Sequence, residues 1–117
     1  MSYEIPEQHQ NLSSFQYAVA KVNDLPPNSW ALQPNTEVTR LLFKLKALGY
    51  KNVREPQEND LVVYFNSDDT SPQHMGVYQE NGMVISKLGI KSSVAHKHPI
   101  FAMPKEYGRT IMFMRKK

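Results

Sequence analysis

The stretch that decides the fold consists of three runs: Asp60-Leu61-Val62-Val63-Tyr64-Phe65, then Gln73-His74-Met75-Gly76-Val77-Tyr78, then Glu80-Asn81-Gly82 leading into Met83-Val84-Ile85-Ser86-Lys87. The first run is apolar without alternation, as expected of a strand that is covered on both faces. Asn81-Gly82 supplies the left-handed backbone that a tight hairpin turn requires. We therefore predict a β-meander in which residues 74–79 and 83–88 are antiparallel neighbours.

The first predicted helix precedes this meander and covers residues 11–22. Apolar side chains recur there at helical spacing, and three polar residues offer caps for the first turn: Asn11, Ser13 and Ser14. Residues 1–10 show no such pattern, so we expect them to be the loosest part of the chain.

A second helix is predicted from a stripe of apolar side chains, with Asn35 as its cap and Gly49 as its stop. The stripe consists of Val38, Leu41, Leu42, Leu45 and Leu48. The segment between the helices, residues 25–34, contains three prolines and the only tryptophan, so we predict an ordered loop that Trp30 pins down.

Further strands are predicted at residues 50–54 and 109–115, whereas residues 89–98 are polar and typical of a loop or an irregular strand. Two helices followed by strands give an α+β layout, with both helices packed on an antiparallel sheet. A chain of 117 residues is long enough for one hydrophobic core, so residues 1–117 are predicted to form a single domain.

Composition narrows the classes of function. The chain is 40% hydrophobic and 21% charged, and no apolar run approaches the length of a membrane span. The net charge is +3, and its densest basic run, Arg115-Lys116-Lys117, is not interleaved with aromatic residues, so we expect neither a nucleic-acid partner nor a membrane partner. The chain opens on no secretory signal, so we expect the cytoplasm, a signal-independent export route, or a signal that has already been removed.

His74 is the first candidate for a chemical role. It stands where a predicted strand emerges from a polar loop, a position that holds a side chain rigidly and leaves it reachable, as a general base requires. The alternative is a surface histidine at a strand end. The sequence contains no cysteine, which excludes disulfides, thiolate metal sites and a thiol nucleophile.

The block from Asp60 to Lys87 resembles the core of the NlpC-type cell-wall peptidases, within the papain-like cysteine hydrolase superfamily. The matching features are an acidic residue that opens a buried strand, a His-x-Gly-apolar-Tyr strand and an Asn-Gly hairpin. The later segments, containing His98-Pro99 and Pro104-Lys105-Glu106-Tyr107-Gly108, are similar to a bacterial branch of that group. The resemblance implies a papain-like fold, no cofactor, a peptide or protein substrate, and amide hydrolysis or acyl transfer, with peptidoglycan peptides as one substrate class.

In that family the nucleophile is a cysteine at the start of the helix before the sheet, and the histidine is its base. The stretch Ser13-Ser14-Phe15-Gln16-Tyr17-Ala18 resembles the family's helix start, with Ser14 where the cysteine would stand. A hydroxyl is a far weaker acid than a thiol, so Ser14 is expected to be nearly inert. Three interpretations stay open: a cysteine engineered to serine, a natural pseudoenzyme, and a serine that only caps the helix.

The resemblance also implies a third catalytic residue that orients the imidazole. The family position, twelve residues past the base, is Ser86, which is a poor orienter; His98 is the better candidate. Lys87 is expected to bind a carboxylate or to be exposed. A metal site made by His74, His96 and His98 is a further alternative, which we do not favour because no carboxylate stands at ligand spacing.

The predicted catalytic residues are therefore Ser14, His74 and His98, with no cofactor and no metal. The competing hypothesis is a binding module that uses the same cleft to recognise a peptide or a partner protein without chemistry. Small domains of this bacterial branch also serve as toxins or effectors, although no residue here favours that role. The sequence leaves the oligomeric state open.

Overall fold

The computed structural model describes residues 2–5, 10–23, 25, 29–33, 37–65, 72–88, 94–102, 108 and 110–117. Within these residues, two α-helices and one antiparallel sheet of seven strands form an α+β domain, which confirms the predicted α+β layout. The helices are α1 (Ser14–Asn23) and α2 (Val38–Ala47), with a short 3-10 turn η2 (Trp30–Leu32) between them. The strands are β1 (Ser2–Glu4), β2 (Tyr50–Val53), β3 (Leu61–Phe65), β4 (Pro72–Tyr78), β5 (Met83–Ser86), β6 (Val94–Pro99) and β7 (Thr110–Lys116).

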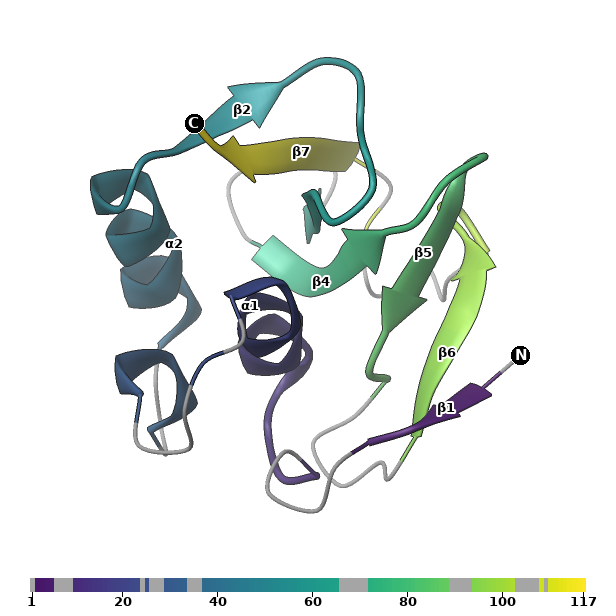
Figure 1. Ribbon diagram of the computed structural model, residues 1–117, viewed down its shortest axis with the longest axis horizontal. Coiled ribbons are helices and arrows are strands. Elements are labelled where there is room, and N and C mark those ends of the chain that lie inside the picture. The colour runs from purple at the N-terminus through teal and green to yellow at the C-terminus, as the bar shows by residue number, and fades with distance from the viewer. Residues whose placement is uncertain are drawn as a thin grey trace.

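The strands are ordered β1-β6-β5-β4-β3-β7-β2, so the predicted meander β3-β4-β5 forms the middle of the sheet (Figure 1). In the register of β3 with β4, Leu61 faces Val77 and Tyr64 faces His74. The turn between β4 and β5 places Asn81 at φ 54° and Gly82 at φ 77°, so the left-handed turn predicted from Asn-Gly is confirmed.

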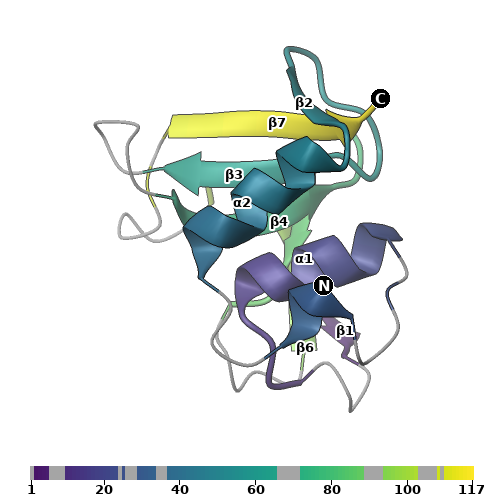
Figure 2. The same cartoon turned by 90° about the vertical axis from the view of Figure 1, so that its left-hand side faces the viewer.

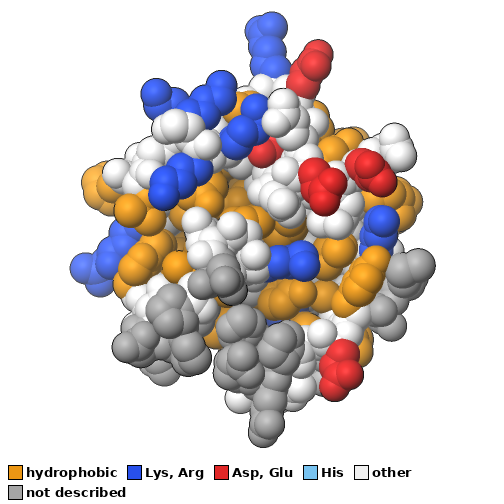
Figure 3. Space-filling view, in the orientation of Figure 1, with side chains coloured by type: hydrophobic (Ala, Val, Ile, Leu, Met, Phe, Trp, Pro, Cys, Tyr) orange, Lys and Arg blue, Asp and Glu red, His pale blue; other side chains and the backbone are white. Residues whose placement is uncertain are grey.

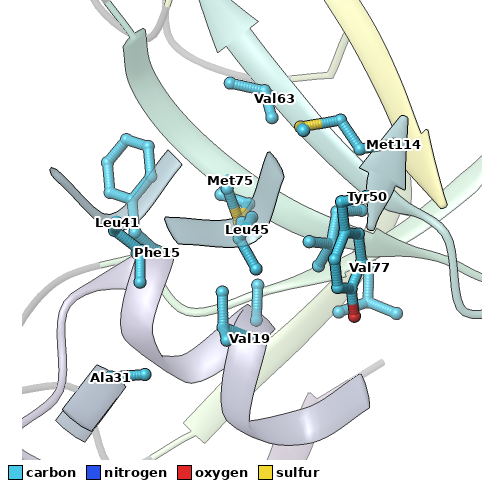
Figure 4. Packing of buried hydrophobic residues seen from close by; sticks show 12 residues of the cluster. Phe15, Val19, Ala31, Leu41, Leu45, Tyr50, Val63, Met75, Val77 and Met114 are labelled. Carbon is cyan, nitrogen blue, oxygen red and sulfur yellow. The ribbon is translucent and has the colours of Figure 1, made fainter. Parts of the chain in front are cut away.

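Both helices pack on one face of the sheet, which curves around α1 (Figures 1 and 2). The main core forms where side chains of α1, α2 and the sheet point toward one another (Figure 4). Its members include Phe15, Val19, Leu41, Leu45, Leu61, Val63, Met75, Val77 and Met114. These residues bury the apolar stripes of the helices against the odd-numbered positions of β3 and β4.

The opposite face of the sheet is also covered. Val62, Tyr64 and Val84 are fully buried there, packed with four partly buried side chains: Tyr78, Ile100, Ile111 and Phe113. Side chains alternate between the faces of a strand, and β3 has buried side chains on both. This explains why its sequence is apolar without alternation, as predicted.

The N-terminus differs from the prediction. We expected residues 1–10 to be loose, but β1 pairs with β6, and Ile5 is buried against Leu12 and Ala95. Residues 1 and 6–9 lie outside the described part. The polar stretch 89–98 was predicted to be a loop or an irregular strand, yet β6 is a regular strand between β1 and β5. β6 is hydrogen-bonded along both edges, to β1 and to β5, and this pairing stabilises it as a strand although its sequence shows no apolar alternation.

The helix boundaries also shift. α1 begins at Ser14 instead of residue 11, and the prolines around η2 do not prevent a short 3-10 turn. The predicted cap Asn35 lies outside the described residues. α2 ends before Gly49, whose φ of 100° makes it the predicted stop. Leu48 is 49% exposed, so its predicted place in the buried stripe is wrong, because it lies beyond the last helical turn.

A partly buried ion pair ties the start of β3 to the end of β7. The Asp60 carboxylate accepts hydrogen bonds from Arg115 Nε at 2.8 Å and Nη2 at 2.7 Å, and from the backbone N–H of Gln57 at 2.7 Å. Asp60 is buried, and Arg115 also donates to the carbonyl of Glu55. Because its carboxylate is fully used inside the fold, the acidic residue that opens the meander has a structural role.

Gly76 allows β4 and β5 to pack closely. A Cβ placed there would overlap Val84 Cγ1 and lie 3.2 Å from the Cβ of Ser86. We predict that Gly76→Ala lowers the free energy of unfolding by about 1–3 kcal/mol, the usual cost of overpacking. Urea denaturation measures this, with Asn52→Ala on exposed edge strand β2 as a control that should change little. Equal stability of the two variants would contradict the packing described here.

Candidate functional site

The first turn of α1 is fixed by a reciprocal pair of hydrogen bonds. Ser13 Oγ accepts from the backbone N–H of Gln16 at 3.2 Å, and Gln16 Oε1 accepts from the backbone N–H of Ser13 at 3.1 Å. This arrangement is a capping box, in which Ser13 is the N-cap. Ser14 is therefore the first helical residue, and the hypothesis that Ser14 itself caps the helix is wrong.

Gln16 also anchors the loop that follows α1. Its amide Nε2 donates to the carbonyl of Ala31 at 3.0 Å and to that of Gln33 at 2.8 Å. Trp30, in the same turn, packs on the main core, and Lys44 of α2 lies 5.1 Å from the centre of its ring. Trp30 thus holds this segment against α2, as predicted.

His74 lies in β4 on the sheet face away from α1. Met75 and Val77 belong to the core that α1 covers, so His74, one residue earlier, points to the other face. There its ring meets that of Tyr64 edge-on, with ring centres 5.4 Å apart. His74 is 2% exposed, which excludes the alternative of a surface histidine. Burial, together with the nearby His98, lowers the pKa of His74 to about 3, so the ring is neutral.

The structure does not bring Ser14 and His74 together. No hydrogen bond joins them, and among the described residues the Ser14 hydroxyl has no side-chain partner. The reason is the alternation of β4: α1 packs against Met75, whereas His74 lies in the other layer. The dyad geometry expected from the NlpC-type resemblance is therefore absent between these two residues.

His98, the predicted orienter of His74, is engaged elsewhere. Its Nδ1 lies 2.8 Å from the carbonyl oxygen of Pro99, which can only accept, so Nδ1 carries the proton. Its Nε2 then accepts from the hydroxyl of Ser86 at 2.5 Å. Burial lowers the pKa of His98 as well, so the neutral form is favoured.

The hydrogen bonds from Ser86 to His98 and from His98 to the carbonyl of Pro99 follow the order of a nucleophile, a base and an orienting acceptor. The Ser86 side chain is fully buried, however, and His98 is only 9% exposed. A substrate cannot reach the hydroxyl, so this pair satisfies polar groups inside the second layer. The sequence predicts both positions as candidates for the residue that orients His74, whereas in the structure Ser86 and His98 are hydrogen-bonded to each other.

The structure also bears on the expected role of Lys87 and on the alternative metal site. Lys87, expected to be exposed or to bind a carboxylate, is fully buried, and burial lowers its pKa. The alternative metal site needs His74, His96 and His98 to converge, but the described residues contain no cluster of three possible ligands.

A groove that the sequence analysis missed lies between α2 and the sheet. It has a volume of about 290 Å³. Its α2 side is formed by Thr39, Leu42, Phe43 and Lys46. Its floor and far side are formed by Phe65, Pro72, Met112 and Met114. The α2 residues follow helical spacing i, i+3, i+4 and i+7, so they form one stripe beside the buried leucines.

Phe43 is the most exposed large apolar side chain among the described residues, at 74%. A single exposed apolar residue is common, but Phe43 lies at the wall of a mostly apolar groove, which is typical of an interaction site. The sequence held one signal for it, an aromatic residue in α2 outside the leucine stripe.

Neither of the two described α-helices is long and apolar enough to cross a membrane.

Comparison with known proteins adds a family but no activity. The family described as a domain of unknown function, DUF7689, matches residues 6–115. No curated protein and no solved structure matches the chain. The match covers the helices, the capping box, His74, His98 and the groove.

The buried histidines predict a dependence of stability on pH. The pKa of His74 is lowered from its ordinary value of 6.5 to about 3 in the folded protein. Between these two pH values, only the unfolded chain takes up the proton. The contribution of His74 to the free energy of unfolding is therefore complete above pH 6.5 and is lost as the pH falls towards 3. The slope for one histidine is at most about 1.4 kcal/mol per pH unit. Urea denaturation at several pH values measures it.

Two variants identify the source of this slope. His74→Gln, which cannot be protonated, should make the slope shallower and leave the contribution of His98, whereas His96→Gln in β6 keeps both His74 and His98 and should largely preserve the slope. A slope in His74→Gln that is as steep as in the original protein would mean that His74 is not its source.

Proposed function

The chain belongs to the DUF7689 family, and we propose that it is a papain-like domain that binds a peptide segment of a partner protein without cleaving it. Two features support the papain-like, NlpC-type lineage. Ser14 opens the helix that packs on the sheet, and the His-x-Gly-apolar-Tyr pattern forms β4, followed by the Asn-Gly hairpin. This order of elements is the one that the NlpC-type resemblance of the sequence implies.

The state of the expected base argues against hydrolysis. A general base works best when its pKa lies near the working pH, and His74 has a pKa of about 3. It lies in the other layer from Ser14 and is buried. A serine hydroxyl without a nearby base is a poor nucleophile. A role in binding therefore fits these residues better than a role in peptide cleavage, on peptidoglycan or elsewhere.

The observation that carries the proposal is the groove between α2 and the sheet. At about 290 Å³ it lies at the lower end of small-molecule sites, which enclose most of their ligand. Open apolar grooves of this kind instead accept side chains of a peptide that lies along them. Met112 and Met114 suit such a role, because methionine side chains adapt to different ligands.

The absence of catalysis is tested at Ser14. We expect the thiol of Ser14→Cys to react with iodoacetamide at a rate that His74→Gln does not change, because the two side chains do not meet. The start of a helix by itself lowers a thiol pKa, so dependence on His74, and not the rate alone, is the decisive result. The control is Ser14→Cys combined with His98→Gln. A loss of reactivity specific to His74→Gln would support a hydrolase site instead.

Binding is tested at Phe43. A peptide-display selection against the full chain should yield ligands whose affinity falls about tenfold or more in Phe43→Ala, as for a central contact residue. Leu48→Ala is the matched control, since Leu48 is an exposed apolar residue beside the same helix that does not line the groove. Ligands that bind Phe43→Ala as well as the original protein would contradict the proposal.

A further inference from the structure

The helix that walls the groove is basic. α2 carries Arg40, Lys44 and Lys46, all exposed, and no acidic residue occurs between Val38 and Ala47. Lys46 lines the groove itself. On the face drawn in Figure 3, basic side chains gather with hydrophobic ones over α2, on the left, and acidic side chains lie away from it. The apolar groove is therefore bordered by positive charge.

These cations are not neutralised within the described part of the protein. The ion pair seen there joins Arg115 to Asp60, far along the chain from α2. Arg40 and Lys46 have no carboxylate partner among the described residues, and the ammonium of Lys44 lies over the ring of Trp30. The charges of Arg40 and Lys46 thus remain available to an acidic partner.

The walls of the groove limit what can enter it. Phe43 stands out from α2, while Met114 at the floor is fully buried. An incoming apolar side chain would contact Phe43 on one side and Met112 on the other. Lys46 lines the groove one turn after Phe43, and Arg40 is exposed one turn before Phe43, so carboxylates of the ligand would flank its apolar side chains.

We propose that the groove binds an acidic amphipathic segment of a partner protein, with apolar side chains at helical spacing in the groove and carboxylates facing Arg40 and Lys46. This inference rests on the proposed function and names the partner's chemistry. A second copy of this chain is a poor occupant, because a symmetric contact through α2 would bring like charges together.

The test uses the full chain and two synthetic peptides with leucines at i, i+3, i+4 and i+7. Glutamates fill the remaining positions of one peptide, and lysines those of the other. We expect fluorescence anisotropy to show at least tenfold tighter binding of the glutamate peptide, weakening as salt is added. Lys46→Glu should reduce its affinity about tenfold, and Lys51→Glu, exposed on β2 outside the groove, should not.

Other results would overturn the inference in distinguishable ways. If neither peptide binds, or both bind alike, while display-selected peptides still require Phe43, the acidic segment is wrong and the proposed function stands. If no Phe43-dependent peptide is found either, both fail. Sedimentation with phosphatidylserine vesicles that depends on Phe43, without peptide binding, would indicate a membrane surface instead. A dimer in analytical ultracentrifugation that Phe43→Ala dissociates would indicate self-association.

Discussion

The alternation of side chains along β3 and β4 is the constraint on which the rest of the structure depends. Both strands lie in the middle of the sheet and are buried on both faces, so neighbouring residues enter separate layers. Met75 joins the layer that α1 and α2 cover, and His74 joins Tyr64 in the other. A shift of one residue in this register would exchange the two layers completely.

This separation determines where chemistry is possible. The layer that contains His74, His98 and Ser86 is closed to solvent, and burial keeps its imidazoles neutral. The layer that contains α1 includes Ser14, and no base among the described residues is hydrogen-bonded to its hydroxyl. The groups typical of a hydrolase are thus present in the chain but divided by the sheet, and Ser86 and His98 satisfy one another inside the fold.

α2 combines two surfaces in one short helix. Leu41 and Leu45 face the core, and the adjacent stripe with Phe43 and Lys46 faces the groove. The core-facing stripe fixes the helix on the sheet, so the outer stripe is presented on a rigid support. The cation–π contact of Lys44 with Trp30 joins this helix to the segment held by Gln16, which links the groove wall to the start of α1.

The sequence alone determined the elements that local chemistry specifies: the meander, the Asn-Gly turn, the leucine stripe of α2 with its Gly49 stop, and hence the α+β class. It could not assign β1 or β6 as strands, because their stability comes from pairing with distant segments and not from their own patterns. Only the tertiary structure decided which side chains meet. The pairing of Ser86 with His98, the separation of Ser14 from His74, and the groove beside Phe43 all depend on which face of the sheet the helices cover, and residue spacing along one chain does not contain that information.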